Sequence, residues 1–275
     1  MGLSEIELVE AVEAPDRCGK SSFGENGPVH VETAPAKLTL SLKMVGLRDD
    51  GYHLIDAEMV SLDLADTLTF SEGDGLTITI TGTAARGLGV EATHDNLVAK
   101  ALNMLGRRAH VDILKRIPAG GGLGGGSADA AAVFRWAECT GDRDVMAAAK
   151  LGADISFCIL GGRARVTGIG EIVTPLPFVA RTFTLLTPPF GVSTPSVYRA
   201  WDGLGGPTAD GPNDLESAAL IVEPRLLEWR DGLGELTGQT PILAGSGSTW
   251  FVEGAFEGSY EGIELLTVHT TARVL

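Results

Sequence analysis

Long apolar runs and any regular pattern of cysteines are missing from this 275-residue chain. No uninterrupted apolar stretch approaches the roughly 18 residues that a membrane-spanning helix needs, and Met1–Glu7 lacks the basic and apolar regions of a signal peptide. The three cysteines, Cys18, Cys139 and Cys158, are odd in number and lack metal-ligand spacing, which argues against a zinc site or a disulfide framework. We therefore expect a reduced, cytoplasmic protein that does not act at a membrane.

Positive charge is scarce as well. Lysine and arginine number 21 against 36 aspartates and glutamates, so the formal net charge is −15 at pH 7. Nucleic acids are bound by clustered lysine and arginine, so this balance argues against a nucleic-acid partner. A site for an anionic small molecule must then be positive locally, through backbone amides, Mg²⁺ and a few cations such as Lys37 and Lys43.

Glycine, in contrast, is concentrated in one segment. Gly120–Gly126 contains six glycines, broken only by Leu123. Glycine reaches positive φ at little cost and has no Cβ, so successive N–H groups can turn inward around an anion. The alternating segment Val111–Ile117 predicts a strand before this loop, and Ser127–Thr140 predicts a helix after it, whose N-terminus favours negative charge. Strand, glycine loop and helix N-terminus together predict a phosphate-binding site.

Other interpretations of the glycine-rich sequence fit less well. A Walker A loop requires lysine before its serine, but Ser127 follows Gly126 directly. The dinucleotide pattern can be laid over Gly120–Gly125, but no suitable acidic residue ends a strand about 20 residues further on. A flexible linker is rarely followed at once by an apolar helix. A second Walker-like segment at 14–21 has no apolar strand before it and no apolar helix after it, so we assign residues 1–30 to a polar leader.

Hydrophobic periodicity predicts an α+β protein in two halves, residues 31–174 and 175–275. In the first half the expected strands are Val31–Val45, Glu58–Leu64, Thr67–Ser71, Leu76–Thr81 and Val111–Ile117, and the expected helices are Asn96–Arg107, Ser127–Thr140 and Arg143–Leu151. In the second half the expected strands are Thr182–Thr187, Pro241–Ala244, Thr249–Glu253 and Thr267–Arg273, and the expected helices are Thr194–Asp202, Asn213–Val222 and Pro224–Leu233. We expect surface loops at Gly203–Pro212 and Gly254–Gly262, and Thr194 as a helix N-cap.

Two charged residues are candidates for chemistry. Lys37 begins an apolar strand, and Asp154 opens an apolar segment rather than a solvated loop. Each also has a simpler interpretation: Lys37 as a lysine at a sheet end with its ammonium in water, and Asp154 as a helix N-cap. Tyr52 and His53 lie side by side in a turn, and Gly245–Ser248 forms a second glycine turn ahead of a strand.

Taken in order, these segments resemble the GHMP small-molecule kinases. Three segments carry the likeness: Pro35–Leu38 around the lysine, the loop Gly120–Ser127, and the late turn Ala244–Ser248. The likeness runs from about residue 34 to residue 275. Further segments resemble the members of that family that act on a cytidyl alcohol: Asp50–His53, His94–Leu97, Lys115–Pro118, Leu151–Asp154, Gly168–Glu171, Gly191–Pro195 and Asn213–Glu216.

The resemblance implies a two-domain fold, with an N-terminal domain like ribosomal protein S5 domain 2 and a ferredoxin-like C-terminal domain. It also implies a reaction: ATP-dependent phosphorylation of the 2-hydroxyl of 4-diphosphocytidyl-2-C-methyl-D-erythritol, in non-mevalonate isoprenoid biosynthesis. Such an enzyme uses Mg²⁺, binds ATP and a small cytidyl alcohol, and is a monomer or a weak homodimer.

Roles in phosphoryl transfer follow from the same resemblance. Asp154 is expected to accept the proton of the substrate hydroxyl, and Lys37 to keep that carboxylate ionised and offset charge on the transferred phosphoryl group. Ser127 is expected near Mg²⁺, and Asn96 on the adenine side. The loop expected around the triphosphate consists of Pro118, Ala119, Gly120, Gly121, Gly122, Leu123, Gly124, Gly125, Gly126, Ser127 and Ala128.

The resemblance also assigns the substrate side. Tyr52 and Tyr198 are expected to enclose the cytosine ring, while His53 contacts the edge of the base. Thr194 lies beside them, and Thr39 contacts the substrate next to the lysine. All five are carried over from the family pattern by their positions in this sequence.

Two positions depart from that pattern. Thr39 stands where an asparagine is usual, two residues after the lysine, and Ser156 stands where a proline is usual. Neither departure removes a catalytic group, but both leave the identity of the substrate less defined than the type of reaction. Two alternatives therefore stay open: another GHMP kinase, acting on homoserine, mevalonate or a sugar, and a non-catalytic nucleotide-binding module of the same fold.

Overall fold

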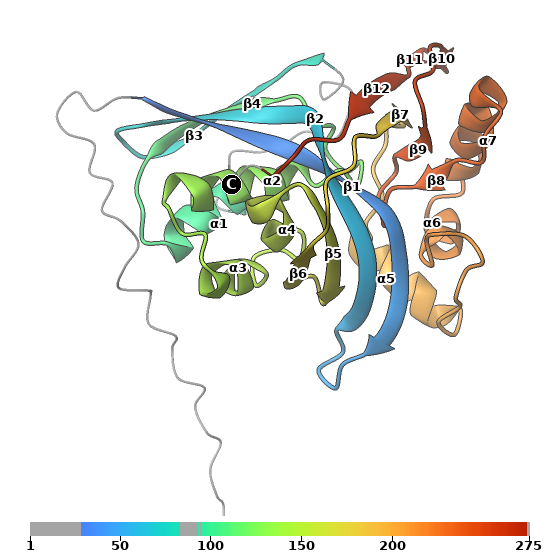
Figure 1. Ribbon diagram of the computed structural model, residues 1–275, viewed down its shortest axis with the longest axis horizontal. Coiled ribbons are helices and arrows are strands. Elements are labelled where there is room, and N and C mark those ends of the chain that lie inside the picture. Colours follow the sequence, from blue (N-terminus) through green and yellow to red (C-terminus); the bar gives the residue numbers. More distant parts are fainter. Residues whose placement is uncertain (1–28, 83–92, 94, 274–275) are drawn as a thin grey trace, which may run out of the picture.

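The computed structural model describes residues 29–82, 93 and 95–273. It contains a six-stranded and a four-stranded β-sheet with helices packed against them (Figure 1), which confirms the predicted α+β class. Nearly all of the leader predicted at 1–30 lies outside the described residues. No helix within the described ranges has the length and apolar character needed to cross a membrane.

Two long strands, β1 (His30–Leu47) and β2 (His53–Ser71), form the centre of the six-stranded sheet and pair antiparallel along their whole length. The prediction of two separate strands within β2 was wrong, because Ala65 and Asp66 continue the pairing with β1 between the two predicted strands. The pairing register shifts between Pro35 and Lys37. Such irregularities change the direction of nearby side chains, and this one lies directly beside Lys37.

Four shorter strands complete this sheet, in the order β3-β4-β2-β5-β6. They are β3 (Gly75–Ile80), β4 (His110–Lys115), β5 (Arg163–Gly168) and β6 (Ile172–Pro175). Strands β4 and β5 share the edge of β2 that β1 leaves free, and only β3 and β4 run parallel. The β5–β6 hairpin was not predicted: β5 alternates between polar and apolar residues only over Arg163–Thr167, and β6 has four residues with no alternation.

Helices α1 to α4 gather on one side of the six-stranded sheet (Figure 1). They are α1 (Leu97–Met104), α2 (Gly125–Trp136), α3 (Asp142–Ala148) and α4 (Ile155–Leu160). Helix α2 lies at the centre, in contact with β1, β2, α1 and α4. Its alanines allow close approach to the sheet, and the ring of Trp136 stacks on Phe70 with centroids 4.6 Å apart. Helix α4 was not predicted, because six residues that are all apolar except Ser156 are too few to show a helical periodicity.

The second sheet has four short antiparallel strands: β7 (Thr182–Leu186), β8 (Ile242–Leu243), β9 (Trp250–Glu253) and β12 (Leu266–His269). Their order, β12-β7-β9-β8, is the arrangement of a ferredoxin-like sheet. Between β7 and β8 lie the helices α5 (Thr194–Gly203), α6 (Glu216–Val222) and α7 (Leu226–Thr237). Between β9 and β12 the chain forms only a hairpin of β10 (Ser259–Tyr260) and β11 (Ile263–Glu264). Strand β10 lies inside the predicted loop Gly254–Gly262, and β11 follows it.

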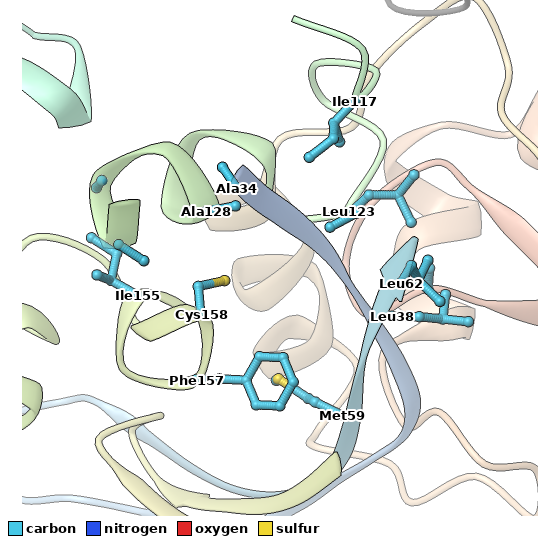
Figure 2. Close-up of a cluster of buried hydrophobic side chains, with 14 of the residues drawn as sticks. Ala34, Leu38, Met59, Leu62, Ile117, Leu123, Ala128, Ile155, Phe157 and Cys158 are labelled. Carbon is cyan, nitrogen blue, oxygen red and sulfur yellow. The ribbon is translucent and has the colours of Figure 1, made fainter. Parts of the chain in front are cut away.

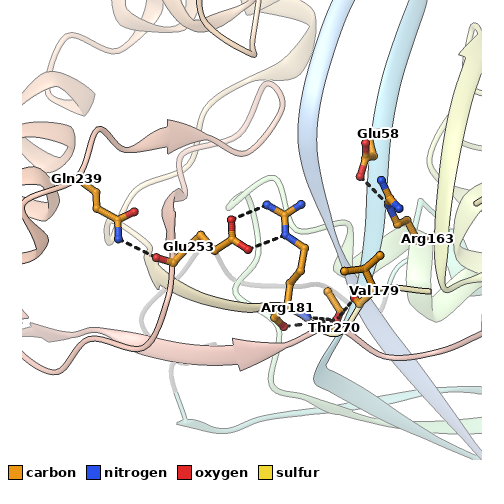
Figure 3. A network of polar contacts seen from close by, with 7 residues as sticks. All are labelled: Glu58, Arg163, Val179, Arg181, Gln239, Glu253 and Thr270. Atoms are coloured by element: carbon orange, nitrogen blue, oxygen red, sulfur yellow. Dashed lines mark hydrogen bonds and ion pairs between the residues drawn. The ribbon is translucent and has the colours of Figure 1, made fainter. Parts of the chain in front are cut away.

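Polar contacts fix the ends of these strands (Figure 3). The guanidinium of Arg181, just before β7, donates two hydrogen bonds of 2.8 Å to the carboxylate of Glu253 at the end of β9. The amide of Gln239 donates to the carbonyl of Glu253 at 2.9 Å. Thr270, following β12, accepts a hydrogen bond from the N–H of Arg181 at 2.9 Å.

The predicted domain division near residue 174 stays a prediction, although β6 ends there and the second sheet follows.

Two segments of the second half of the chain contact the six-stranded sheet directly. Leu62 in β2 forms an isolated bridge with Thr270, and Leu42 in β1 forms one with Asn213. The buried cluster in Figure 2 joins β1, β2, α2, α4 and the glycine loop into one core. The two bridges therefore join β1 and β2 to the second half of the chain.

Candidate active site

The glycine loop is anchored by its one large side chain. Leu123 is buried in the cluster that contains Leu38 and Leu62 (Figure 2), and its carbonyl accepts a hydrogen bond of 3.0 Å from the N–H of Lys37. The loop is therefore tied to β1 at the lysine. Helix α2 begins at Gly125, two residues earlier than predicted, so its free N–H groups open directly on the loop.

Two glycine loops from the two halves of the chain touch one another. A Cβ on Gly122 would lie 2.5 Å from the carbonyl oxygen of Ala244 and 2.7 Å from the Cα of Gly247. The N–H of Thr249 donates to the carbonyl of Gly121 at 3.1 Å. Only residues without side chains allow this approach, which explains the glycines in both turns.

Lys37 and Asp154 meet at this junction. Nζ of Lys37 lies 3.3 Å from Oδ2 of Asp154 and donates a hydrogen bond of 3.0 Å to Oγ1 of Thr39. The Lys37 side chain is 6% exposed, so it does not extend into water from the end of the sheet. Asp154 holds the N-cap position of α4, but its side chain makes no capping hydrogen bond. The carboxylate is 31% exposed and remains open to a ligand.

Two cavities share this pair as part of their walls. One, of about 570 Å³, lies over the glycine loop and the N-terminus of α2. The other, of about 520 Å³, lies between the turn at Tyr52, the segment before Asp154 and the start of α5. Five residues line both cavities: Lys37, Ser127, Asp154, Thr194 and Ser246. The arrangement can hold two ligands that meet at one carboxylate and one ammonium group.

The first cavity contains most of the residues predicted for ATP. The predicted residues that line it are Asn96, Pro118, Ala119, Gly120, Gly122, Leu123, Gly124, Gly125, Gly126 and Ser127. Gly121 and Ala128 do not line it; Gly121 contacts Thr249, and Ala128 is buried in α2. The side chain of Asn96 also caps α1, because its Oδ1 accepts from the N–H of Val98 at 2.9 Å.

A buried charge cluster beneath the loop was not predicted. Nζ of Lys115 donates to the carboxylates of Asp66 and Asp129, the latter at 2.6 Å, and all three side chains are almost fully buried. Asp66 also accepts from the N–H of Ile117 at 2.9 Å. Burial raises the pKa of Asp129 to about 7, against the opposing attraction of Lys115. The sequence shows only that these charged residues lie within apolar segments, and this pattern does not indicate which of them form ion pairs.

The second cavity contains the residues predicted for the substrate. Thr39, Tyr52, His53, Thr194 and Tyr198 all line it. Tyr52 is 57% exposed. Tyr198 packs against His53 with ring centroids 5.0 Å apart, and burial raises the pKa of its hydroxyl to about 12.

Some predicted positions have other roles. Ser193 is the N-cap of α5, so the prediction of Thr194 as the N-cap was wrong. The hydroxyl of Thr194 instead lies 2.8 Å from Oγ of Ser246. Lys43 lines neither cavity, because its ammonium donates to Asp214 at 2.9 Å. Ser156 is buried, and its hydroxyl donates to the carbonyl of Val145 at 2.8 Å, which ties α4 to α3.

Asn213 supports the second glycine turn, a role that sequence reasoning missed. Its side-chain amide donates to the carbonyls of Leu243 at 2.9 Å and Gly245 at 2.7 Å. The residue was expected inside a helix, but α6 begins only at Glu216. The one indication of a role in the sequence was that Asn213 lies in a segment, Asn213–Glu216, that resembles the GHMP kinases.

Comparisons with known proteins agree with this geometry. The family described as GHMP kinases N terminal domain matches residues 96–162, which include the glycine loop and Asp154. A 4-diphosphocytidyl-2-C-methyl-D-erythritol kinase from Paracoccus denitrificans (strain Pd 1222) is 37% identical over 244 residues, covering 82% of this chain and 87% of the relative. The chain belongs to this kinase family.

Further similarities to this kinase family extend over most of the chain. A member from Ruegeria pomeroyi (strain ATCC 700808 / DSM 15171 / DSS-3) is 36% identical over 244 residues, covering 79% of this chain and 86% of the relative. The crystal structure of a 4-(cytidine 5'-diphospho)-2C-methyl-D-erythritol kinase has a TM-score of 0.64 at 28% identity, covering 88% of this chain and 99% of that one. The resemblance inferred from the sequence is confirmed, and the chain is a kinase of the GHMP type.

Proposed function

We propose that this protein transfers the γ-phosphoryl group of ATP to the 2-hydroxyl of 4-diphosphocytidyl-2-C-methyl-D-erythritol, in non-mevalonate isoprenoid biosynthesis. The observation that carries the proposal is the pair of cavities that meet at Lys37 and Asp154. A kinase needs such a junction, because the phosphoryl group passes between two ligands in line.

In this proposal ATP occupies the cavity over the glycine loop. The N–H groups at the start of α2 and around Gly124 contact the phosphates, and the positive end of the helix dipole favours their charge. These backbone donors explain how a chain of net charge −15 binds a polyanion. Asn96 borders the same cavity on the side of α1 and contacts the nucleoside.

Asp154 is the general base of the reaction. Asp154 lines both cavities, and its carboxylate accepts the proton of the attacking hydroxyl, while Lys37 stabilises the carboxylate and the charge on the phosphoryl oxygens. The hydrogen bond from Lys37 to Thr39 fixes the ammonium group at this point. Thr39 thus performs a positioning role that an asparagine carbonyl could also perform.

Mg²⁺ fits the oxygen donors near the loop. In nucleotide sites the ion is held by one or two protein oxygens together with phosphates and water. The hydroxyl of Ser127 borders both cavities, and Oδ1 of Asp129 is buried in the wall of the first cavity without a hydrogen-bond partner among the described residues. Ser127 would hold the ion, which when bound neutralises negative charge on the phosphates.

The second cavity favours a cytidyl alcohol over the small alcohols of other GHMP kinases. Tyr52, His53 and Tyr198 give it an aromatic side that a base can stack on. Small aliphatic alcohols such as homoserine and mevalonate have no ring that could stack there. A cytoplasmic location and a monomeric or weakly dimeric state remain predictions.

An ADP-release assay across a panel of alcohols tests the proposal. The panel contains the cytidyl alcohol, homoserine, mevalonate and a hexose, each with MgATP. We expect ADP release to depend on the cytidyl alcohol alone. Release with another member instead would reassign the substrate, and ATP binding without release for any alcohol would indicate a non-catalytic module.

A further inference from the structure

His53 is held by one face of α5. Tyr198, Trp201 and Asp202 follow the i, i+3, i+4 spacing that brings side chains to a single face of a helix. The ring centroid of His53 lies 5.0 Å from that of Tyr198 and 5.5 Å from that of Trp201. Its Nε2 lies 2.7 Å from Oδ1 of Asp202. Two rings and one carboxylate therefore give the imidazole a single orientation.

Asp202 determines which nitrogen of this imidazole carries the proton. An ionised carboxylate only accepts hydrogen bonds, so the contact with Asp202 requires an N–H on Nε2 of His53. In the neutral ring Nδ1 then keeps a lone pair. Nδ1 has no hydrogen-bond partner within the part of the chain that the structure describes. His53 lines the substrate cavity and Asp202 does not, so any effect of Asp202 on a ligand passes through the ring.

We propose that Asp202 is a positioning residue through which His53 selects cytosine over uracil. The inference rests on the proposed function, in which the cytidyl group occupies the cavity beside His53. Cytosine carries a 4-amino donor where uracil carries a 4-oxo acceptor. A lone pair on Nδ1 accepts a hydrogen bond from the amino group and repels the oxo group. The tautomer that Asp202 imposes therefore determines that cytosine is preferred over uracil.

The selectivity of three proteins tests this inference. Wild type, Asp202→Asn and Asp210→Asn are compared by kcat/KM on the cytidyl alcohol and on its uridine counterpart. The side chain of Asn can turn oxygen or NH2 toward Nε2, so it no longer imposes one tautomer. The cytidine-to-uridine ratio should fall about tenfold or more in Asp202→Asn, the scale of one good base-edge pair, with KM for ATP unchanged. Asp210→Asn removes the same charge from an exposed position nearby and should keep the ratio.

Nitrogen-15 NMR of labelled histidine supplies a readout that a purely structural role would not change. Wild-type His53, assigned by its absence in His53→Gln, should be protonated on Nε2, and Asp202→Asn should show a mixture. An unchanged ratio in Asp202→Asn, or wild-type His53 protonated on Nδ1 at assay pH, overturns the inference. With wild type active on the cytidyl alcohol, those results overturn this inference alone; activity only on another alcohol overturns the proposed function itself.

Discussion

The side chain of Lys37 fills the space in which a Cβ on Gly124 would lie. A Cβ there would be 2.7 Å from Cγ of Lys37 and 3.3 Å from its Cε, and Gly124 has a φ of +70°. The glycine at the N-cap of α2 is thus required by the lysine as well as by the loop. Loop conformation and the position of the ammonium group are coupled through this one contact.

Replacement of Gly124 by alanine should therefore impair phosphoryl transfer. The added methyl group displaces Lys37 from Asp154, and a misplacement of about 1 Å in a catalytic group can lower the rate by about 100-fold. We expect kcat to fall on this scale while thermal unfolding shows that the protein remains folded. Steady-state kinetics with saturating ATP measure the effect.

Gly126→Ala is the matched comparison. Its Cβ would meet only Cδ1 of Leu97, at 3.5 Å, and the residue is helical. We expect a smaller loss of kcat than in Gly124→Ala. Equal losses in both variants would show that the contact between Gly124 and Lys37 does not control catalysis.

The aromatic side of the second cavity gives a prediction on affinity. Stacking of a base on an aromatic ring contributes roughly 1–3 kcal/mol, so Tyr52→Ala should raise KM for the cytidyl alcohol about ten- to a hundredfold. KM for ATP should hardly change. Because Tyr52 is 57% exposed, its removal should leave the melting temperature unchanged.

Tyr198→Ala should show a different combination. It should raise the same KM but also lower the melting temperature, since Tyr198 packs against His53. The two effects on KM should be less than additive because the rings share one ligand. If Tyr52→Ala moved neither KM, the cytidyl group would not stack there.

Asp129 predicts a pH dependence of stability. Burial raises its pKa to about 7, whereas in the unfolded chain a carboxyl of this type has a pKa near 3.9. Between these values the native protein keeps a proton that the unfolded chain has released. The stability from this group is therefore present at acid pH and is lost as the pH rises toward 7, by up to about 1.4 kcal/mol per pH unit.

Asp129→Asn removes this titration. Denaturant unfolding of both proteins without ATP, at about pH 5 and about pH 7, isolates the contribution of Asp129. The free energy of unfolding of wild type relative to the variant should be lower at the higher pH. A difference that stays constant or increases with pH would show that Lys115 keeps the carboxylate ionised throughout.

The local features of the site were predictable from the sequence. A glycine tract between a strand and an apolar helix is typical of a phosphate-binding loop, and Lys37 and Asp154 are conspicuous because each is a charged residue at the start of an apolar segment. Residues whose role depends on a partner far away in the sequence were not predictable. Lys115 contacts Asp66, 49 positions earlier, and Asn213 holds Gly245, 32 positions later, and neither distance leaves a periodic signal.

The fold shows the same division. The long alternating strands and the longer helices were predicted from the sequence, except that β2 was predicted as two separate strands. Short elements such as α4 and the β5–β6 hairpin are stabilised by contacts with the rest of the core rather than by local propensity. Tertiary packing of this kind overrides sequence pattern where an element has only four to six residues.

The rate of phosphoryl transfer in Asp154→Asn tests the central claim most directly. Asn keeps the size of the side chain but cannot accept the hydroxyl proton as a base. With the cytidyl alcohol and MgATP, kcat should fall by about 100-fold or more, the usual scale for loss of a general base, while calorimetry shows ATP affinity changed only modestly. A folded variant that retains a kcat close to wild type would contradict the assignment of Asp154 as the base, and with it the account of the junction between the two cavities.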